Sequence, residues 1–403
     1  MGENKPYSLM GQTHLLPREE MLETGKRKKR VTIGIPKDYS QYENRVPLTP
    51  QGVELLVENG HTILFEAGAG DRAHYFDHDF SECGAKIVKK EEVFSADIIL
   101  KISAPNKDEI ELLKPNQVVF SLIYLYNHSR ETIQKMMEKK IIAVGYELLK
   151  DDNDCYPILR SMSEIEGAAS VMIASEYLSK AHNGKGVLLG GITGISPAEV
   201  VILGAGTAGE FAARAALGLG ASVKVFDNSF HRLRTLEHNI GQRIFTSVLH
   251  PPAVTKAMLS ADALIGSLRY LQAGPTFMVT EDQVSQMKPG SIIIDLSMDQ
   301  GGCIETSKCT NFDRPIFHKH GVIHYCVPNI ASRVSRTSSI ALSNIFAPIL
   351  LNLGESGGIQ NLIKEDIGLS HGVYLYKGIL TNNLIANRFN LPFKDIGLLM
   401  AAF

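Results

Sequence analysis

The chain has 403 residues, of which 44% are hydrophobic, and its formal net charge is −2. This length exceeds one ordinary hydrophobic core, so we expect about two domains. The small net charge excludes a general attraction to nucleic acid or anionic membranes, and no apolar run approaches the length of a membrane span.

Residues 1–30 are polar, end in the basic run Lys26–Arg30, and predict a solvated N-terminal arm rather than a signal peptide. The five cysteines are scattered and include no CxxC pair. They predict free thiols in a reducing cytoplasm, and no metal site is expected.

After the arm, short apolar runs alternate with helical patterns. Strands are expected at 31–35, 62–66, 97–101, 118–122 and 141–146. Thr49 can cap a helix that begins at Pro50, and Gly60 can stop it. This alternation is typical of a parallel α/β sheet and predicts a first Rossmann-like unit without a glycine fingerprint.

A long helix is expected from Met162 to about His182, and another from Thr337 to about Leu353. Between them, we expect strands at 199–203, 222–226, 243–247, 263–266, 291–296 and 322–326.

The clearest motif lies between the first two of these strands: Gly204 and Gly206, then Thr207, Ala208 and Gly209. In this G-x-G-x-x-G pattern the first glycine permits a tight turn, the second admits a pyrophosphate, and the third lets the helix pack on the strand. Thr207 and Ala208 begin that helix, so their backbone N–H groups can donate to a phosphate. Such glycines also occur in ordinary turns, but here strand, helix and next strand all agree.

Asp227 ends the next strand, near the spacing of the acid that binds ribose hydroxyls. Because its charge disfavours a 2′-phosphate, we predict NAD rather than NADP. The fold class is α/β, with two Rossmann-like, doubly wound parallel-sheet domains joined by long helices. We expect residues 1–30 to form the arm, residues 31–160 and 355–403 a discontinuous substrate domain, and residues 161–354 the NAD-binding domain with the linking helices.

Six segments together resemble the alanine dehydrogenase family, which also includes the NAD-binding subunit of proton-translocating transhydrogenase. They are Ile33–Lys37 with Glu43–Val46, Met162–Glu164, Gly190–Ile195, the glycine fingerprint, Met298–Cys303 and Tyr325–Asn329. The resemblance covers about residues 31 to 392. It implies an active site in the cleft between two Rossmann-like domains and, usually, a homohexamer.

The resemblance also implies roles for single residues. Arg45 matches the family's carboxylate-binding arginine, although it could instead form a surface salt bridge. Asp299 matches the catalytic aspartate near the nicotinamide ribose and the reacting nitrogen, although it could merely shape the following glycine turn. The matches on the cofactor side are Ser163, Leu268 and Asn329 near the nicotinamide, and Arg232 near the adenosine ribose.

Two residues depart from the family. Ser103 stands at the place of the substrate-binding lysine, and Tyr124 stands at the place of the catalytic histidine. Serine supplies no positive charge, and tyrosine is a poor base near pH 7 unless its pKa is lowered. Lys101, on the same strand face as Ser103, is a candidate replacement cation, and His128 is a candidate replacement base.

Three hypotheses about the function stay open. We favour an NAD-dependent dehydrogenase that converts L-alanine and water to pyruvate, ammonium and NADH. The second is a family enzyme with a changed amino-acid or imino-acid substrate, since Ser103 and Tyr124 alter the site. The third is a non-catalytic NAD-binding sensor or scaffold. The transhydrogenase role is disfavoured, because nothing in the sequence indicates docking to a membrane partner.

Overall fold

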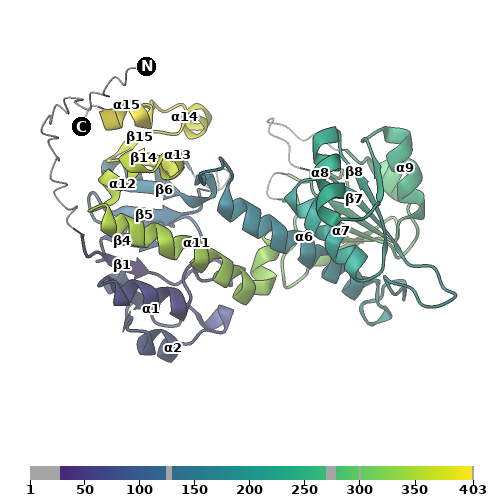
Figure 1. The fold of residues 1–403 in the computed structure, drawn as a ribbon, viewed down its shortest axis with the longest axis horizontal. Coiled ribbons are helices and arrows are strands. Elements are labelled where there is room, and N and C mark those ends of the chain that lie inside the picture. Colours follow the sequence, from purple (N-terminus) through teal and green to yellow (C-terminus); the bar gives the residue numbers. More distant parts are fainter. Residues whose placement is uncertain (1–27, 124–128, 269–277, 299–300, 402–403) are drawn as a thin grey trace, which may run out of the picture.

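The computed structural model describes residues 28–123, 129–268, 278–298 and 301–401. Within these ranges the chain forms two lobes, each built around one β-sheet (Figure 1). Helices α6 (Pro157–Leu178) and α11 (Ser335–Glu355) run between the lobes. The expected α/β architecture with long joining helices is confirmed.

The sheet of the first lobe has the strand order β15-β14-β6-β5-β4-β1-β2-β3 among the described residues. Strands β1 to β6 run parallel, whereas β14 pairs antiparallel with both β6 and β15. The strands are β1 Thr32–Ile35, β2 Thr62–Glu66, β3 Lys86–Val88, β4 Ile98–Leu100, β5 Val118–Ser121, β6 Ile142–Gly145, β14 Val373–Tyr376 and β15 Ile379–Leu380.

The sheet of the second lobe has the order β12-β13-β11-β10-β7-β8-β9 in the described part of the chain. It is parallel except for β12, which pairs antiparallel with β13. The strands are β7 Glu199–Leu203, β8 Ser222–Phe226, β9 Phe245–Ser247, β10 Ala263–Gly266, β11 Ile292–Asp295, β12 Ile316–Lys319 and β13 Val322–Tyr325. Each sheet is therefore parallel except at one edge, where antiparallel strands extend it.

The remaining helices cover the two sheets. In the first lobe they are α1 Pro50–Glu58, α2 Asp77–Glu82, α3 Lys90–Val93, α4 Lys107–Leu112, α5 Arg130–Glu138, α12 Ile359–Glu365, α13 Ile367–Gly372, α14 Asn383–Phe389 and α15 Ile396–Ala401. In the second lobe they are α7 Thr207–Gly218, α8 Phe230–Ile240, α9 Pro251–Ser260 and α10 Glu281–Ser285.

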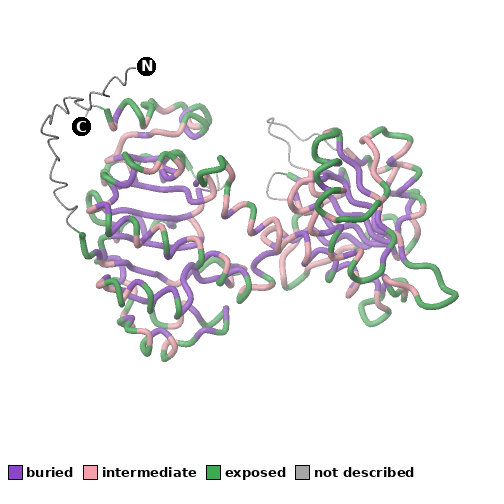
Figure 2. Tube along the Cα trace, viewed as in Figure 1, coloured by how far each residue is buried: buried purple, intermediate pink, exposed green. Residues whose placement is uncertain are grey.

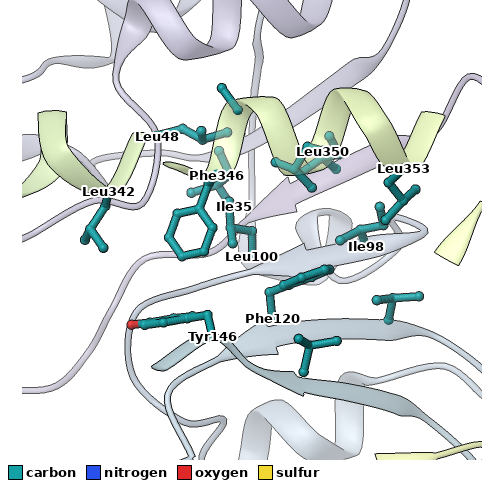
Figure 3. Packing of buried hydrophobic residues seen from close by; sticks show 14 of the residues in the cluster. Ile35, Leu48, Ile98, Leu100, Phe120, Tyr146, Leu342, Phe346, Leu350 and Leu353 are labelled. Carbon is teal, nitrogen blue, oxygen red and sulfur yellow. The ribbon is translucent and has the colours of Figure 1, made fainter. Parts of the chain in front are cut away.

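Both faces of each sheet are covered, because alternate residues of one strand enter different cores. Ile98 and Leu100 of β4 pack with α1 and α11, whereas Ile99 packs with α4, α5 and α14. Figure 3 shows the first of these cores, in which Phe346 and Leu350 of α11 lie over the strands. Strand β7 divides its residues in the same way. Figure 2 shows buried chain running through the centre of both lobes. Doubly wound packing is confirmed.

The predicted elements agree with the structure except at their ends. Thr49 caps α1 by accepting from the Gly52 N–H, as expected, and α1 ends just before Gly60, whose φ is +87°. The strand expected at 243–247 begins at Phe245, and the long helix expected from Met162 begins earlier, at Pro157. Strands β3, β12, β14 and β15 were not predicted.

Among the described residues, one stretch, Ile330–Glu355, is long and apolar enough to cross a membrane by length and composition, and an 18-residue window of it has a mean hydropathy of 1.3. This corrects the expectation that no apolar run has such a length. Half of that window is buried inside the structure, and Leu342, Phe346 and Leu350 lie in the core of the first lobe. Here the stretch is a core helix of an α/β lobe.

Candidate functional site: a dinucleotide loop facing a buried arginine

The turn after β7 has the geometry that the glycine motif predicts. Gly204 has φ +109°, and a Cβ there would lie 2.8 Å from Ser267 Oγ. A Cβ at Gly209 would lie 1.9 Å from the Gly204 carbonyl oxygen, so only glycine fits where α7 meets the turn. A Cβ at Gly206 would meet no atom of the described residues within 4 Å. Open space at Gly206 is what a pyrophosphate needs to approach the backbone.

Helix α7 begins at Thr207, followed by Ala208, with Gly206 as its N-cap. No side chain in the described part of the chain caps this end, so its N–H groups suit an anion such as a dinucleotide phosphate. Helix α6 packs closely against the same end, since a Cβ at Gly167 would lie 2.2 Å from the Ala208 carbonyl oxygen. The long joining helix is thereby fixed to the dinucleotide loop.

Asp227 follows β8 and is buried. One carboxylate oxygen accepts from the Ala205 N–H at 2.8 Å, and the other accepts from the Ser229 N–H at 2.7 Å. The Arg232 side chain is 62% exposed, and its guanidinium lies 3.8 Å from Asp227. Asp227 is thus a buried carboxylate fixed beside the glycine turn, at the place where dinucleotide-binding folds carry an acid for the ribose.

The residues predicted near the nicotinamide come from three elements. Ser163 is half-buried on α6. Leu268 follows β10, and its carbonyl accepts from Ser297 Oγ at 2.6 Å. Asn329 follows β13 with φ +61°, and its Nδ2 donates to Glu43 Oε2 at 3.0 Å. Only Asn329 is thereby joined directly to a residue of the first lobe.

Arg45 lies in the loop between β1 and α1 and is buried, with 7% of its surface exposed. Its Nε and Nη2 donate to the two carboxylate oxygens of Glu43 at 2.7 and 2.6 Å. Its Nη1 lies 3.4 Å from Met162 Sδ on α6. The surface salt bridge considered from the sequence is therefore wrong. Arg45 forms a buried pair where the first lobe meets α6 and Asn329.

Ser103 follows β4 and lines a cavity of about 580 Å³ at the carboxyl edge of the first sheet, where α/β folds bind ligands. Its N–H donates to Asp38 Oδ2 at 2.8 Å, and Asp38 lines the same cavity. Lys101 also lines the cavity, but its Nζ binds the buried carboxylate of Glu109 at 2.6 Å. The ammonium group that was a candidate to replace the family's lysine is therefore paired with a carboxylate inside the protein.

Tyr124, His128 and Asp299 lie outside the described residues. Described residues on either side of positions 299–300 bind one carboxylate. Asp295, fully buried at the end of β11, accepts from the N–H groups of Ser297 and Cys303 at 3.0 Å each. It also accepts from Ser307 Oγ at 2.8 Å. Burial raises the pKa of Asp295 above its ordinary value.

Two acidic residues of the site were not predicted from the sequence: Glu43 appeared only as part of a motif, and Asp38 was not identified. Both are buried acids on the loop that follows β1. The available signal was a charged residue at the carboxyl end of an apolar strand, a place where ligand-binding groups gather. A negative charge two residues before Arg45 was a second signal.

Comparisons with known proteins identify relatives over most of the chain. The family model described as alanine dehydrogenase/PNT, N-terminal domain, matches residues 34–166, and its C-terminal counterpart matches residues 170–383. A Staphylococcus aureus protein named alanine dehydrogenase 2 is 39% identical over 366 residues, which cover 90% of this chain and 98% of that protein.

Solved structures give the same picture. An L-alanine dehydrogenase aligns with a TM-score of 0.84 at 34% identity, covering 89% of this chain and 99% of its own. A transhydrogenase from Sinorhizobium meliloti aligns with a TM-score of 0.75 at 23% identity, covering 88% of this chain and 99% of its own. At that identity the second match shows a shared fold only.

Proposed function

This chain belongs to the alanine dehydrogenase/PNT family, and we propose that it oxidises L-alanine with NAD and water to pyruvate, ammonium and NADH. The resemblance inferred from the sequence motifs is confirmed, and with it the class of NAD-dependent oxidoreductases that act on CH–NH₂ groups. The observation that carries the proposal is the buried Arg45, which shares Glu43 with the cofactor-side residue Asn329.

The residues of the glycine loop fit a dinucleotide. The open space at Gly206 and the uncapped start of α7 would receive the pyrophosphate, and Asp227 would accept hydrogen bonds from the adenosine ribose. A 2′-phosphate would meet the Asp227 carboxylate, so NAD is the proposed cofactor rather than NADP. When bound, NAD supplies the acceptor for the hydride that leaves Cα of the amino acid.

The chain's own residues would bind the amino acid and move its protons. Arg45 would bind the substrate carboxylate, because a guanidinium offers several donors in a planar fork. Asp299 would lie near the reacting nitrogen and exchange a proton there. Tyr124 would donate a hydrogen bond to the developing carbonyl oxygen, and with a lowered pKa it would also exchange a proton.

We assign residues 31–160 and 355–403 to the substrate domain and residues 161–354 to the NAD-binding domain together with the linking helices, of which α11 packs in the core of the first lobe. Strands β14 and β15 belong to the first sheet although they follow the second lobe in the chain, and this supports a substrate domain made of two separate segments. By family resemblance we propose a homohexamer in the cytoplasm. A homohexamer predicts that light scattering gives a single species with six times the mass of the chain.

A changed substrate is the second candidate, and the cavity beside Ser103 favours it. A serine at the position of the family's lysine leaves room there and removes a positive charge. A larger or differently charged amino acid would then replace L-alanine in the same reaction.

The deciding experiment is NADH formation by purified protein at alkaline pH with L-alanine and a panel of other amino acids. We expect turnover of L-alanine, and loss of at least about a hundred-fold in Asp299→Ala. Preference for another amino acid would select the second candidate. Tight NAD binding without turnover of any amino acid would overturn both and leave a sensor or scaffold.

A further inference from the structure

Glu43 is the acid around which the arginine site is arranged. It is 3% exposed and accepts from Nε and Nη2 of Arg45, so the guanidinium is held by two parallel charge-assisted bonds. The Arg45 backbone N–H also donates to Glu43 Oε1 at 3.0 Å. The side chain and the backbone of Arg45 are thereby oriented by the same carboxylate.

The same carboxylate reaches the second lobe. Asn329 Nδ2 donates to Glu43 Oε2 at 3.0 Å, and Asn329 begins the 3₁₀ turn Ile330–Val334 that leads into α11. Asn329 adopts the left-handed conformation, with φ +61°, which points to a constrained position. One buried carboxylate therefore joins the carboxylate-binding arginine to a residue predicted near the nicotinamide.

Three serines on this returning segment hold the loop that carries Arg45. Ser339 and Ser343 are four residues apart and lie on one face of α11, Ser332 lies in the 3₁₀ turn that precedes this helix, and all three are buried. Their hydroxyls accept from the backbone N–H groups of Asn44, Val46 and Thr49 at 2.8, 3.0 and 3.1 Å. The loop is thus attached to the segment that returns from the second lobe.

We propose that Glu43 is a positioning residue, which orients the Arg45 guanidinium and couples it to Asn329 so that a bound dinucleotide tightens the substrate site. The proposal rests on the role of Arg45 in the proposed function. A carboxylate is required, because every group that faces it from Arg45 and Asn329 is a donor. A glutamine would turn one of its oxygens into a donor and oppose one of these groups.

The first test is Glu43→Gln. We expect the KM for L-alanine to rise at least about ten-fold, while kcat and the Kd for NADH each change less than about three-fold. Glu66→Gln is the matched control, because Glu66 is a buried acid of the same lobe that binds Lys37 N and Tyr39 Oη and not Arg45. It should leave the KM within about two-fold. Equal KM values in the two variants would overturn the proposal.

A double-mutant cycle separates positioning from a merely structural role. In an Arg45→Lys background, which keeps the charge and loses the fork, Glu43→Gln should add less than about two-fold to the KM. Full additivity of the two changes would show that Glu43 does not act through Arg45.

Hydrogen exchange tests the coupling without turnover. NADH should slow amide exchange of residues 42–49 in the wild type by at least about ten-fold, and far less in Glu43→Gln. Equal protection in both proteins would overturn the coupling. If the wild type bound NADH but oxidised no amino acid, the proposed function would fail, and this measurement alone would decide the role of Glu43.

Discussion

At the scale of single residues, Asp38 and Ser103 lie together at the cavity of the first lobe, and position 103 is where the family resemblance predicts a lysine. Asp38 is buried and accepts from the backbone N–H groups of Ser40 and Ser103. No cationic side chain is paired with Asp38 among the described residues. A buried carboxylate beside a cavity therefore stands where a lysine at position 103 would have neutralised it.

Ser103→Lys should restore a cation at this place. The new ammonium group would reach the cavity, pair with Asp38 and attract a substrate carboxylate, so we expect the KM for L-alanine to fall about ten-fold, or about 1.4 kcal/mol. Ser103→Met provides a side chain of similar length without the charge and should raise the KM. Steady-state kinetics on both variants check this. A KM in Ser103→Lys no lower than in the wild type would argue for a substrate other than L-alanine.

At the scale of elements, the packing of α7 on β7 depends on the absence of a side chain at Gly209. Gly209→Ala would press a Cβ against the Gly204 carbonyl, so we expect a loss of at least about 2 kcal/mol in the free energy of unfolding, together with weaker NADH binding. Gly218→Ala on the same helix is the control, because a Cβ there meets nothing within 4 Å. It should stabilise by about 0.5–1 kcal/mol. Urea unfolding of the two variants checks this prediction. Similar urea concentrations at the unfolding midpoints would contradict the role of Gly209.

The elements with strong apolar runs could be predicted from the sequence, whereas the edge strands could not. The bounds of β7, β8 and β10 were predicted correctly, because β7 and β10 are nearly continuous apolar runs and β8 alternates polar with apolar residues. Strands β3 and β12 are short and partly exposed, and each includes lysine. Strands β14 and β15 lie far along the chain from the sheet that they extend, so only tertiary pairing defines them.

In the site, too, local motifs could be predicted from the sequence, whereas long-range contacts could not. The roles of Gly204, Gly206 and Gly209 follow from a local motif, and the structure agrees with each. The position of Lys101 on the face of Ser103 was predictable, but its partner Glu109 comes from α4. Likewise, the bond between Glu43 and Asn329 joins residues 286 positions apart. Sequence spacing carries no information about such contacts.

At the scale of the whole molecule, each lobe contains a buried histidine that is held neutral. Burial lowers the pKa of His324, in the second lobe, to about 4, and also lowers the pKa of His61, in the first. His324 Nε2 lies 2.8 Å from Thr306 Oγ1, and His61 Nδ1 accepts from the Val31 N–H at 3.3 Å.

These histidines predict a loss of stability in mild acid. Between pH 6.5 and 4 an unfolded histidine binds a proton that the folded His324 does not, so the free energy of unfolding falls as the pH falls. At pH 5 the loss from His324 alone is about 2 kcal/mol. Thermal unfolding of the wild type and His324→Gln from pH 8 to 5 checks this, and the variant should show the shallower decline. Parallel curves would contradict the assignment.

The order in which the chain is synthesised gives the discontinuous first sheet a further consequence. The second sheet uses only residues 199–325, whereas the first needs strands as early as β1 and as late as β15. The loop that carries Arg45 also waits for the serines of the returning segment. On the ribosome, the second lobe can therefore complete its core while the first, although made earlier, still lacks its last strands and its returning helix. The arginine site is thus among the last parts of the chain to form.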